Sequence, residues 1–179
     1  MIFSCSQSKS ILNSDDSKLF IELMEIFIQH DSLYETRTIN KYLLHYDYYE
    51  NEYSEDGYQV PPPYGIGYKN EFDFKESKEL SQFFSDSTSI AHVKYQLLNS
   101  RGTAKNFKIT KRDLIKLGMD NKDQNSWYSF YLPIFNADSS AAFVQYDYYK
   151  NGLGFGNGAI FLKKDGNWKY HTFIPGWIN

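Results

Sequence analysis

The sequence has few of the residues from which covalent, metal or nucleic-acid sites are built. Its single cysteine, Cys5, excludes an internal disulfide. Four histidines are too scattered to form a spaced metal motif, so no metal or other cofactor is expected. The formal net charge of −3 gives no basic field for a phosphate backbone, so nucleic acid is not an expected partner. No apolar run in the sequence is long enough to span a membrane as a helix.

Catalytic motifs are equally scarce. No Gly-x-Ser-x-Gly elbow occurs, and the one cysteine is too close to the N-terminus to support a cysteine nucleophile. His171 and Asp147 form the one candidate acid/base pair, because they lie on predicted neighbouring strands and would meet if the register gave them a common face. A structural histidine is the ordinary interpretation, so no catalytic residue is predicted.

Aromatic residues are abundant, with 16 Tyr and 14 Phe, and the last third of the chain has a regular pattern of them. There, runs of aromatic and β-branched residues alternate with polar turns, and Asp165-Gly166 is a strong hairpin signal because glycine accepts positive φ. This pattern predicts an antiparallel meander between Trp127 and Trp177. The expected strands cover residues 128–132, 142–148, 159–163 and 168–174.

Helical periodicity precedes the meander. The apolar spacing from Leu19 to Phe27 predicts a first helix that begins at Ser14 or Asp15, ends near His30 and covers one face of the sheet. The other expected elements are a strand or short helix at 38–44, helix over 74–99 with a cap at Ser85 or Asp86 and a stop at Gly102, a short strand at 106–110, and a helical turn at 111–117 ended by Gly118. The fold class predicted is α+β: a single domain in which N-terminal and central helices pack on a C-terminal antiparallel β-meander.

The glycines at 152, 154, 156 and 158 resemble a phosphate-binding loop in composition only. Such a loop needs a helix N-terminus after it, whereas Ala159 to Lys163 has the character of a strand. A flexible or bulged crossing between two strands is therefore predicted. Trp168 and Trp177 are expected to seal the core, with ligand stacking as the alternative.

An acidic, tyrosine-rich stretch at residues 46–58 contains five carboxylates, five tyrosines and no lysine or arginine. Like charges cannot be buried unpaired, so the stretch is predicted to be a solvated loop, either purely structural or specialised for binding a basic protein surface. The candidate binding residues are Tyr46, Asp47, Tyr48, Tyr49, Glu50, Glu52, Tyr53, Glu55, Asp56 and Tyr58.

The N-terminal residues 1–13 are polar and small and are predicted to be a tether ahead of a domain over 14–179. Ser4-Cys5 followed by a polar run is typical of the end of a bacterial lipoprotein signal, in which the cysteine is lipidated. No charged region or long apolar region precedes Cys5, so the alternative is a cytoplasmic protein with an accidental cysteine. A lipid on Cys5 would be the only expected route to a membrane.

Several segments of the C-terminal half resemble an uncharacterised family of secreted or lipid-anchored proteins of Bacteroidota over about residues 89–179. The segments that carry the resemblance are 132–136 (LPIFN), 146–149 (YDYY), 152–154 (GLG), 161–169 (FLKKDGNWK) and 177–178 (WI). The resemblance implies an exported protein and brings no established activity. Family members often have two cysteines where this chain has Lys150 and Gly154, so no disulfide or metal role is implied for this loop.

Together these features predict a non-enzymatic protein of the periplasm or cell envelope that binds another protein. An immunity protein that neutralises a secreted antibacterial toxin is one concrete form, since Tyr side chains and complementary charge suit tight, fast association. Two alternatives stay open. One is a hydrolase with a cleft between sheet and helices, and the other is a small-ligand carrier with an aromatic cavity.

Overall fold

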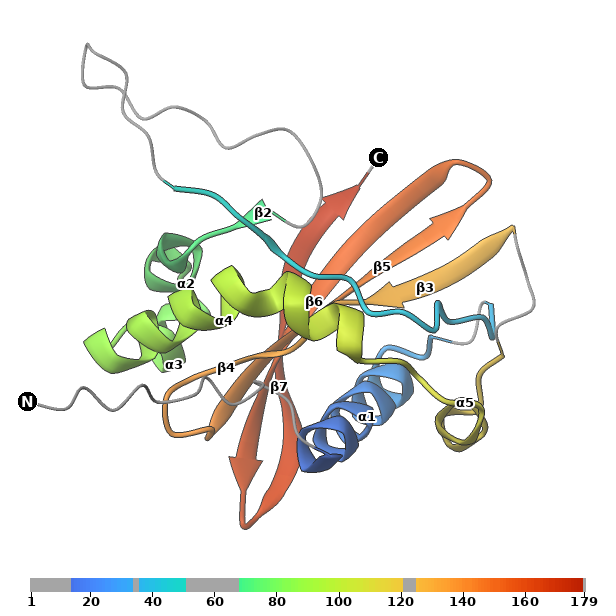
Figure 1. The fold of residues 1–179 in the computed structure, drawn as a ribbon, viewed down its shortest axis with the longest axis horizontal. Helices are drawn as coiled ribbons and strands as arrows, with labels where there is room; N and C mark the ends of the chain where they lie inside the picture. Colours follow the sequence, from blue (N-terminus) through green and yellow to red (C-terminus); the bar gives the residue numbers. More distant parts are fainter. Residues whose placement is uncertain (1–13, 34–35, 51–67, 121–124, 179) are drawn as a thin grey trace, which may run out of the picture.

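The computed structural model describes residues 14–33, 36–50, 68–120 and 125–178. A five-stranded antiparallel sheet lies at its centre (Figure 1). Four strands follow one another in the order β3-β5-β6-β7, and β4 pairs with β5 beside β3. This arrangement confirms the predicted meander and the α+β class. The strands are β3 (Ser126–Phe130), β4 (Ile134–Phe135), β5 (Ala141–Lys150), β6 (Leu153–Lys164) and β7 (Asn167–Ile178).

Two tight turns join the long strands. Asp165-Gly166 has φ values of 52° and 81°, as its sequence predicts, and Asn151-Gly152 has nearly the same pair, 52° and 83°. Positive φ at both central residues matches the twist of the flanking strands. Of the two predicted forms of the glycine-rich crossing, flexible or bulged, the flexible one is wrong, because only Asn151-Gly152 forms the turn, whereas the bulged one agrees with a register shift inside the row. The later glycines belong to β6, where a register shift between Gly156 and Asn157 is the only irregularity in the row.

Helix α1 (Ser14–His30) covers one face of the sheet, as its apolar spacing predicts. Leu23, Met24 and Phe27 are completely buried. The Phe27 ring meets Tyr146 on β5 edge-on at 5.0 Å between centroids and Phe161 on β6 at 5.6 Å, so one helix position touches neighbouring strands. This side of the sheet is a continuous apolar and aromatic core.

The opposite face of the sheet is covered by α2 (Glu71–Glu76), α3 (Ser81–Phe84) and α4 (Ser87–Asn106). Asp86 caps α4 by accepting hydrogen bonds from the backbone N–H groups of Thr88 and Ser89, which confirms the predicted start. The predicted stop at Gly102 is wrong, because α4 continues to Asn106 and brings Ala104 into the core. The predicted strand at 106–110 is reduced to a single bridge between Lys108 and Tyr42.

Helix α5 (Lys111–Leu117) packs beside α1. Its first turn is held by a capping box between Thr110 and Asp113, and it ends at Gly118, which has φ of 67°. Both limits agree with the sequence prediction.

Strand alternation divides the interior into two cores. On β5, Val144 and Tyr146 face α1, whereas Phe143 and Asp147 face the side covered by α2 and α4. In β7, register shifts opposite Gly156/Asn157 and Ile160/Phe161 interrupt this alternation. Phe161 therefore pairs with Tyr170 on the α1 side, while Ile174 packs against the other core.

Residues 38–44 are extended and run beside β3, which decides between the two predicted conformations in favour of a strand-like one. The Asn40 N–H donates to the Tyr128 carbonyl at 2.8 Å, and the Leu44 N–H donates to the Phe130 carbonyl at 2.8 Å. The chain then enters a short parallel pair formed by β1 (Asp47–Tyr48) and β2 (Tyr68–Lys69). The start of the acidic stretch thereby lies against the helical side of the molecule.

Candidate functional site

The beginning of the acidic stretch is tied to α4 by hydrogen bonds. Ser100 Oγ donates to the Tyr46 carbonyl at 2.7 Å, and Arg101 Nη2 donates to Asp47 Oδ1 at 2.8 Å. The Asp47 carboxylate also lies 3.4 Å from His45 Nε2. A cation from a helix distant in the sequence, Arg101, thus offsets a charge in a stretch that has no basic residue of its own.

Tyr48 makes a second set of contacts with the helices. Its hydroxyl donates to Glu71 Oε2 at 3.0 Å, and Lys94 Nζ lies 3.2 Å from Glu71 Oε1 and 5.4 Å from the centre of the Tyr48 ring. These contacts with Tyr48 and Glu71 raise the pKa of Lys94. The side chains of residues 47–48 are therefore held in defined positions against α2 and α4.

The predicted binding residues divide into three groups. Tyr46 is only 1 % exposed, so the expectation that it contacts a partner is corrected: it is a core residue. Asp47 and Tyr48 are partly buried and bonded to the helices, whereas Tyr49 is partly exposed and Glu50 is exposed. The others, together with the proposed lipidation site, lie outside the described residues: Glu52, Tyr53, Glu55, Asp56, Tyr58 and Cys5.

Acidic side chains of α2 lie near Tyr49. Burial, followed by the charges of Asp73 and Glu76, raises the pKa of the Tyr49 hydroxyl. Glu76 is exposed, as is Glu50. The acidic character of residues 46–50 is thereby extended onto α2. These residues, Tyr49, Glu50, Asp73 and Glu76, are called the acidic edge below.

Beneath the acidic stretch, the Tyr46 ring stacks on Tyr131 at 4.8 Å between centroids. The Tyr46 hydroxyl is buried and has no hydrogen-bond partner among the described residues. Burial, with the Asp147 charge as a second cause, raises its pKa well above the usual range. The neutral phenol is therefore the form present at physiological pH.

Asp147 is a completely buried carboxylate on β5. Its closest donors are the Tyr131 hydroxyl, 2.8 Å from Oδ2, and Trp177 Nε1, 2.9 Å from Oδ1. Two longer contacts at 3.4 Å come from Gln145 Nε2 and the Tyr149 hydroxyl. Burial raises the pKa of Asp147, and the hydrogen bonds from Trp177 and Tyr131 oppose that rise. Because donors meet both oxygens, the carboxylate holds four side chains in fixed positions.

The glycines of β6 explain how Trp177 reaches Asp147. A Cβ on Gly156 would lie 2.1 Å from Trp177 Nε1 and 2.4 Å from Asp147 Oδ1, and a Cβ on Gly154 would lie 2.9 Å from Trp177 Cη2. Both positions must therefore lack a side chain so that the indole can lie across the strand. The alternating spacing of these glycines, which puts them on one face of a strand, is the sequence signal for this arrangement.

Three aromatic rings from three different strands lie in a row beside Asp147. Trp127 on β3 stacks on Tyr149 on β5 at 5.5 Å, and Tyr149 lies 6.0 Å from Trp177 on β7. All three side chains are partly exposed, and none belongs to either apolar core. This set, Trp127, Tyr149 and Trp177, is called the aromatic row. Trp168 seals the core as predicted, whereas Trp177 instead completes this surface.

The candidate acid/base pair is not formed. His171 on β7 and Asp147 on β5 are separated by β6, so they are not on neighbouring strands as predicted. His171 is exposed, and its ring contacts Phe83 at 5.2 Å.

Among the described residues, no cluster of three or more His, Cys, Asp or Glu side chains has the arrangement of a metal site. None of the described helices is both long and apolar enough to cross a membrane.

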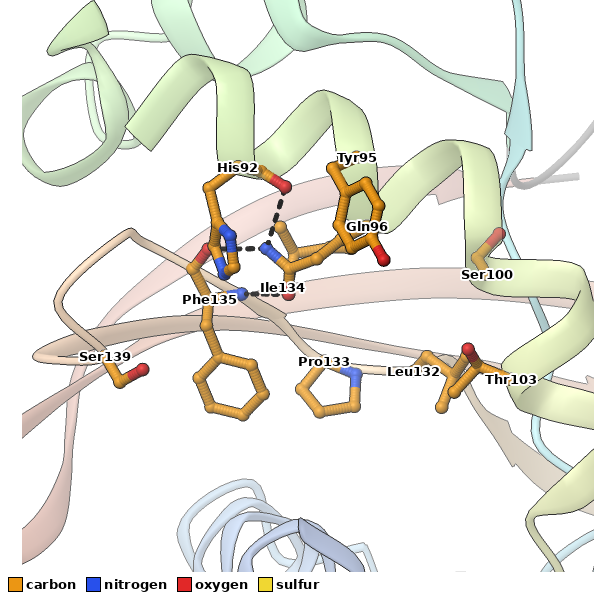
Figure 2. A pocket seen from close by; sticks show the side chains of 10 residues that line it. All are labelled: His92, Tyr95, Gln96, Ser100, Thr103, Leu132, Pro133, Ile134, Phe135 and Ser139. Atoms are coloured by element: carbon orange, nitrogen blue, oxygen red, sulfur yellow. Dashed lines mark hydrogen bonds between the residues drawn. The ribbon is translucent and has the colours of Figure 1, made fainter. Parts of the chain in front are cut away.

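A small pocket lies between α4 and residues 132–135 (Figure 2). Its volume is about 170 Å³, which is close to that of a cavity able to hold one aromatic ring. Gln96 closes one side by accepting from the Phe135 N–H at 3.0 Å and donating to the Phe135 carbonyl at 2.7 Å. Burial lowers the pKa of His92, which also lines the pocket. A neutral imidazole at the rim of an apolar space suits a small uncharged group.

Comparisons with family models, with curated protein sequences and with solved structures found no match to this chain.

Proposed function

We propose that this chain is a non-enzymatic protein of the periplasm or cell envelope, carrying a lipid on Cys5, that binds another protein with a basic surface. The partner would meet the acidic edge and the aromatic row. An immunity protein that neutralises a secreted antibacterial toxin is one form of this function. The alternative location, the cytoplasm, would leave the binding surface unchanged.

The observation that carries the proposal is the row of three partly exposed aromatic rings, two of which are bonded to a buried carboxylate while the third stacks on Tyr149. Trp and Tyr are the residues most often found as binding hot spots, because they bury large area at low entropic cost. Asp147 fixes Trp177 and Tyr149 before any partner arrives. A preorganised surface loses less freedom on binding and so binds more tightly.

The acidic edge supports the same function through charge. Tyr46, which precedes the acidic edge by three residues, is connected to the carboxylate beneath the aromatic row by contacts through Tyr131 to Asp147. Since Asp47 and Tyr48 are fixed to α4 and α2, the exposed Glu50 projects from a defined position. Complementary charge raises the association rate and selects a basic partner.

The experiment is a pull-down from a lysate of the native organism, followed by affinity measurement with the purified partner. The test variant combines Tyr49→Ala with Glu50→Lys, and it leaves Tyr48 intact because that side chain is bonded to Glu71. The control combines Tyr95→Ala with Glu22→Lys, which removes an exposed tyrosine and reverses a charge outside the acidic edge.

We expect one stoichiometric partner whose dissociation constant rises about tenfold or more in the test variant and stays unchanged in the control. Trp127→Ala should weaken the same complex, provided that its thermal unfolding matches the wild type. Equal affinities for test variant and control would contradict a role for the acidic edge. If no partner is retained, thermal-shift measurements with small aromatic compounds would test the pocket of Figure 2 as a carrier site.

A further inference from the structure

The formal net charge of −3 conceals a concentration of positive charge at one end of the molecule. Two adjoining hollows of about 760 and 640 Å³ lie around α5 and share Lys108 and Thr110 in their walls. Six basic residues line them, against two acidic ones, Asp113 and Asp120. The basic residues are Lys18, Lys41, Lys108, Lys111, Arg112 and Lys116.

The two acidic residues in these walls differ in their roles. Asp113 accepts hydrogen bonds from the Thr110 N–H at 2.9 Å and the Thr110 hydroxyl at 2.6 Å, so its carboxylate serves the helix cap. Asp120 is exposed beside Lys41 in the wall of the larger hollow. Of the basic residues, Lys116 is paired with Glu25 at 2.9 Å, whereas Lys111 and Arg112 are exposed. The local balance is clearly positive.

Two large apolar side chains are exposed within the same surface. Ile115 on α5 is 71 % exposed and Tyr42 is 53 % exposed. Lys41 Nζ and Lys108 Nζ lie 5.1 and 5.9 Å from the centre of the Tyr42 ring. Lysine around an aromatic ring and an aliphatic side chain is the combination found on surfaces that lie at the headgroup level of a bilayer.

We propose that this basic face, formed by α5 and the adjoining parts of α1 and residues 41–42, binds the surface of a bilayer that contains anionic phospholipids. The exposed Ile115 favours a bilayer over a nucleic acid, because a phosphate backbone gains nothing from an aliphatic side chain. The position of α5 leaves the acidic edge accessible, because in Figure 1 α5 lies on the other side of the molecule from α2.

The N-terminal sequence strengthens this orientation. Lys18 lines the smaller hollow near the start of α1, and Cys5 precedes Ser14 by nine residues, a span of at most about 30 Å. A lipid on Cys5 would therefore hold this face near the membrane, and one acyl chain plus a basic surface binds far more stably than either alone. The basic face itself needs neither the lipid nor the protein partner proposed above.

The test is co-sedimentation of the full chain, without a lipid on Cys5, with vesicles of phosphatidylcholine alone or mixed with phosphatidylglycerol. The patch variant is Lys108→Glu with Lys111→Glu and Arg112→Glu, and it spares Lys116 so that Glu25 keeps its partner. The control is Lys163→Glu with Lys164→Glu and Lys169→Glu, all exposed on the β6–β7 hairpin. It is closely matched, because Lys163 also lies 5.9 Å from an aromatic ring, that of Trp168.

We expect binding only to the phosphatidylglycerol vesicles, weakening as salt rises, with a loss of about tenfold or more in the patch variant and a much smaller loss in the control. Ile115→Ser should lower binding by about threefold or more. Equal losses in patch variant and control would overturn the proposal, since binding would then follow net charge alone. Binding to a short DNA duplex as tight as to vesicles, or displacement by free phosphate beyond that by chloride at equal ionic strength, would also overturn it.

Discussion

The two faces of the sheet are stabilised in different ways. On the face that α1 covers, Phe27 contacts aromatic rings of β3, β5 and β6. On the opposite face, β5 buries the carboxylate of Asp147. The first face is stabilised by buried apolar area. Many side chains contribute to it, and each contribution depends on how closely their volumes and shapes fit. The second face depends on a few donors and acceptors, each of which becomes costly when its partner is removed. The faces should therefore respond differently to substitution.

Phe27→Ala should have the largest effect, a loss of about 3–5 kcal/mol in the free energy of unfolding, because it leaves a cavity where α1 meets aromatic rings of four strands. Urea denaturation measures this value. A loss below about 1 kcal/mol would show that the core on this side collapses around the missing ring, which would contradict close packing there.

Asp147→Ala should cost about 3 kcal/mol, although it removes only one small side chain. The Tyr131 hydroxyl and the Trp177 indole N–H would lose their acceptor. The fluorescence of Trp177 should shift as its ring is released. Wild-type stability in this variant would mean that the carboxylate does not organise the polar face.

Gly156→Ala should cost about 2 kcal/mol, because the new Cβ would overlap both Trp177 and Asp147. Gly102→Ala is the matched control. It lies inside α4 with nothing within 4 Å of the new Cβ, and it should raise stability by about 0.5–1 kcal/mol. If Gly156→Ala lowers the free energy of unfolding and Gly102→Ala raises it, the absence of a side chain at Gly156 is a requirement of packing.

Tyr46→Phe should stabilise the protein by about 1 kcal/mol, because the hydroxyl is buried without a partner among the described residues. Tyr131→Phe, which removes a hydroxyl bonded to Asp147, should destabilise it. Thermal unfolding of the two variants makes the comparison. Destabilisation by Tyr46→Phe would show that this hydroxyl has a partner, such as an ordered water molecule.

The smallest expected effect is a change in pH dependence. Burial raises the folded-state pKa of Asp147 above its unfolded value of about 3.9, so folding favours the protonated form. Its contribution is fully present below the unfolded pKa and is lost as pH rises through the folded pKa. Asp147→Asn removes this contribution, so the stability difference between wild type and variant should change over that window. Parallel curves from urea titrations at several pH values would contradict the shift.

Local signals in the sequence predicted the elements whose causes are local. The Asp165-Gly166 turn, the Asp86 cap and the end of α5 at Gly118 each depend on residues a few positions apart. The stop at Gly102 failed because tertiary packing overrode propensity: Ala104, two residues later, is buried in the core. For α4, sequence propensity therefore predicted the type of element correctly but not the residue at which it ends.

The candidate site was largely invisible in the sequence, because its contacts depend on strand register and on long-range pairing. Arg101 and Asp47 are 54 positions apart, and nothing in the acidic stretch indicates that α4 supplies its cation. The aromatic row required the pairing of Trp127 with Tyr149 and the position of Trp177 opposite Gly156. The alternating glycines were the one local clue, and it became interpretable only once β6 had a partner on each side.

The two register shifts of β7 also bear on whether a strand of another chain can extend the sheet. β7 ends the strand order of the described sheet, and Phe173 and Ile178 on it are 42 % and 92 % exposed. An exposed edge strand of this kind can pair with a strand of another chain, which would extend the sheet. Here bulges opposite Gly156/Asn157 and Ile160/Phe161 break the ladder, and Pro175 has no N–H to offer. An incoming strand would find only short runs of matching groups, so we expect the irregularity beside Trp177 also to make extension of the sheet at this edge less favourable.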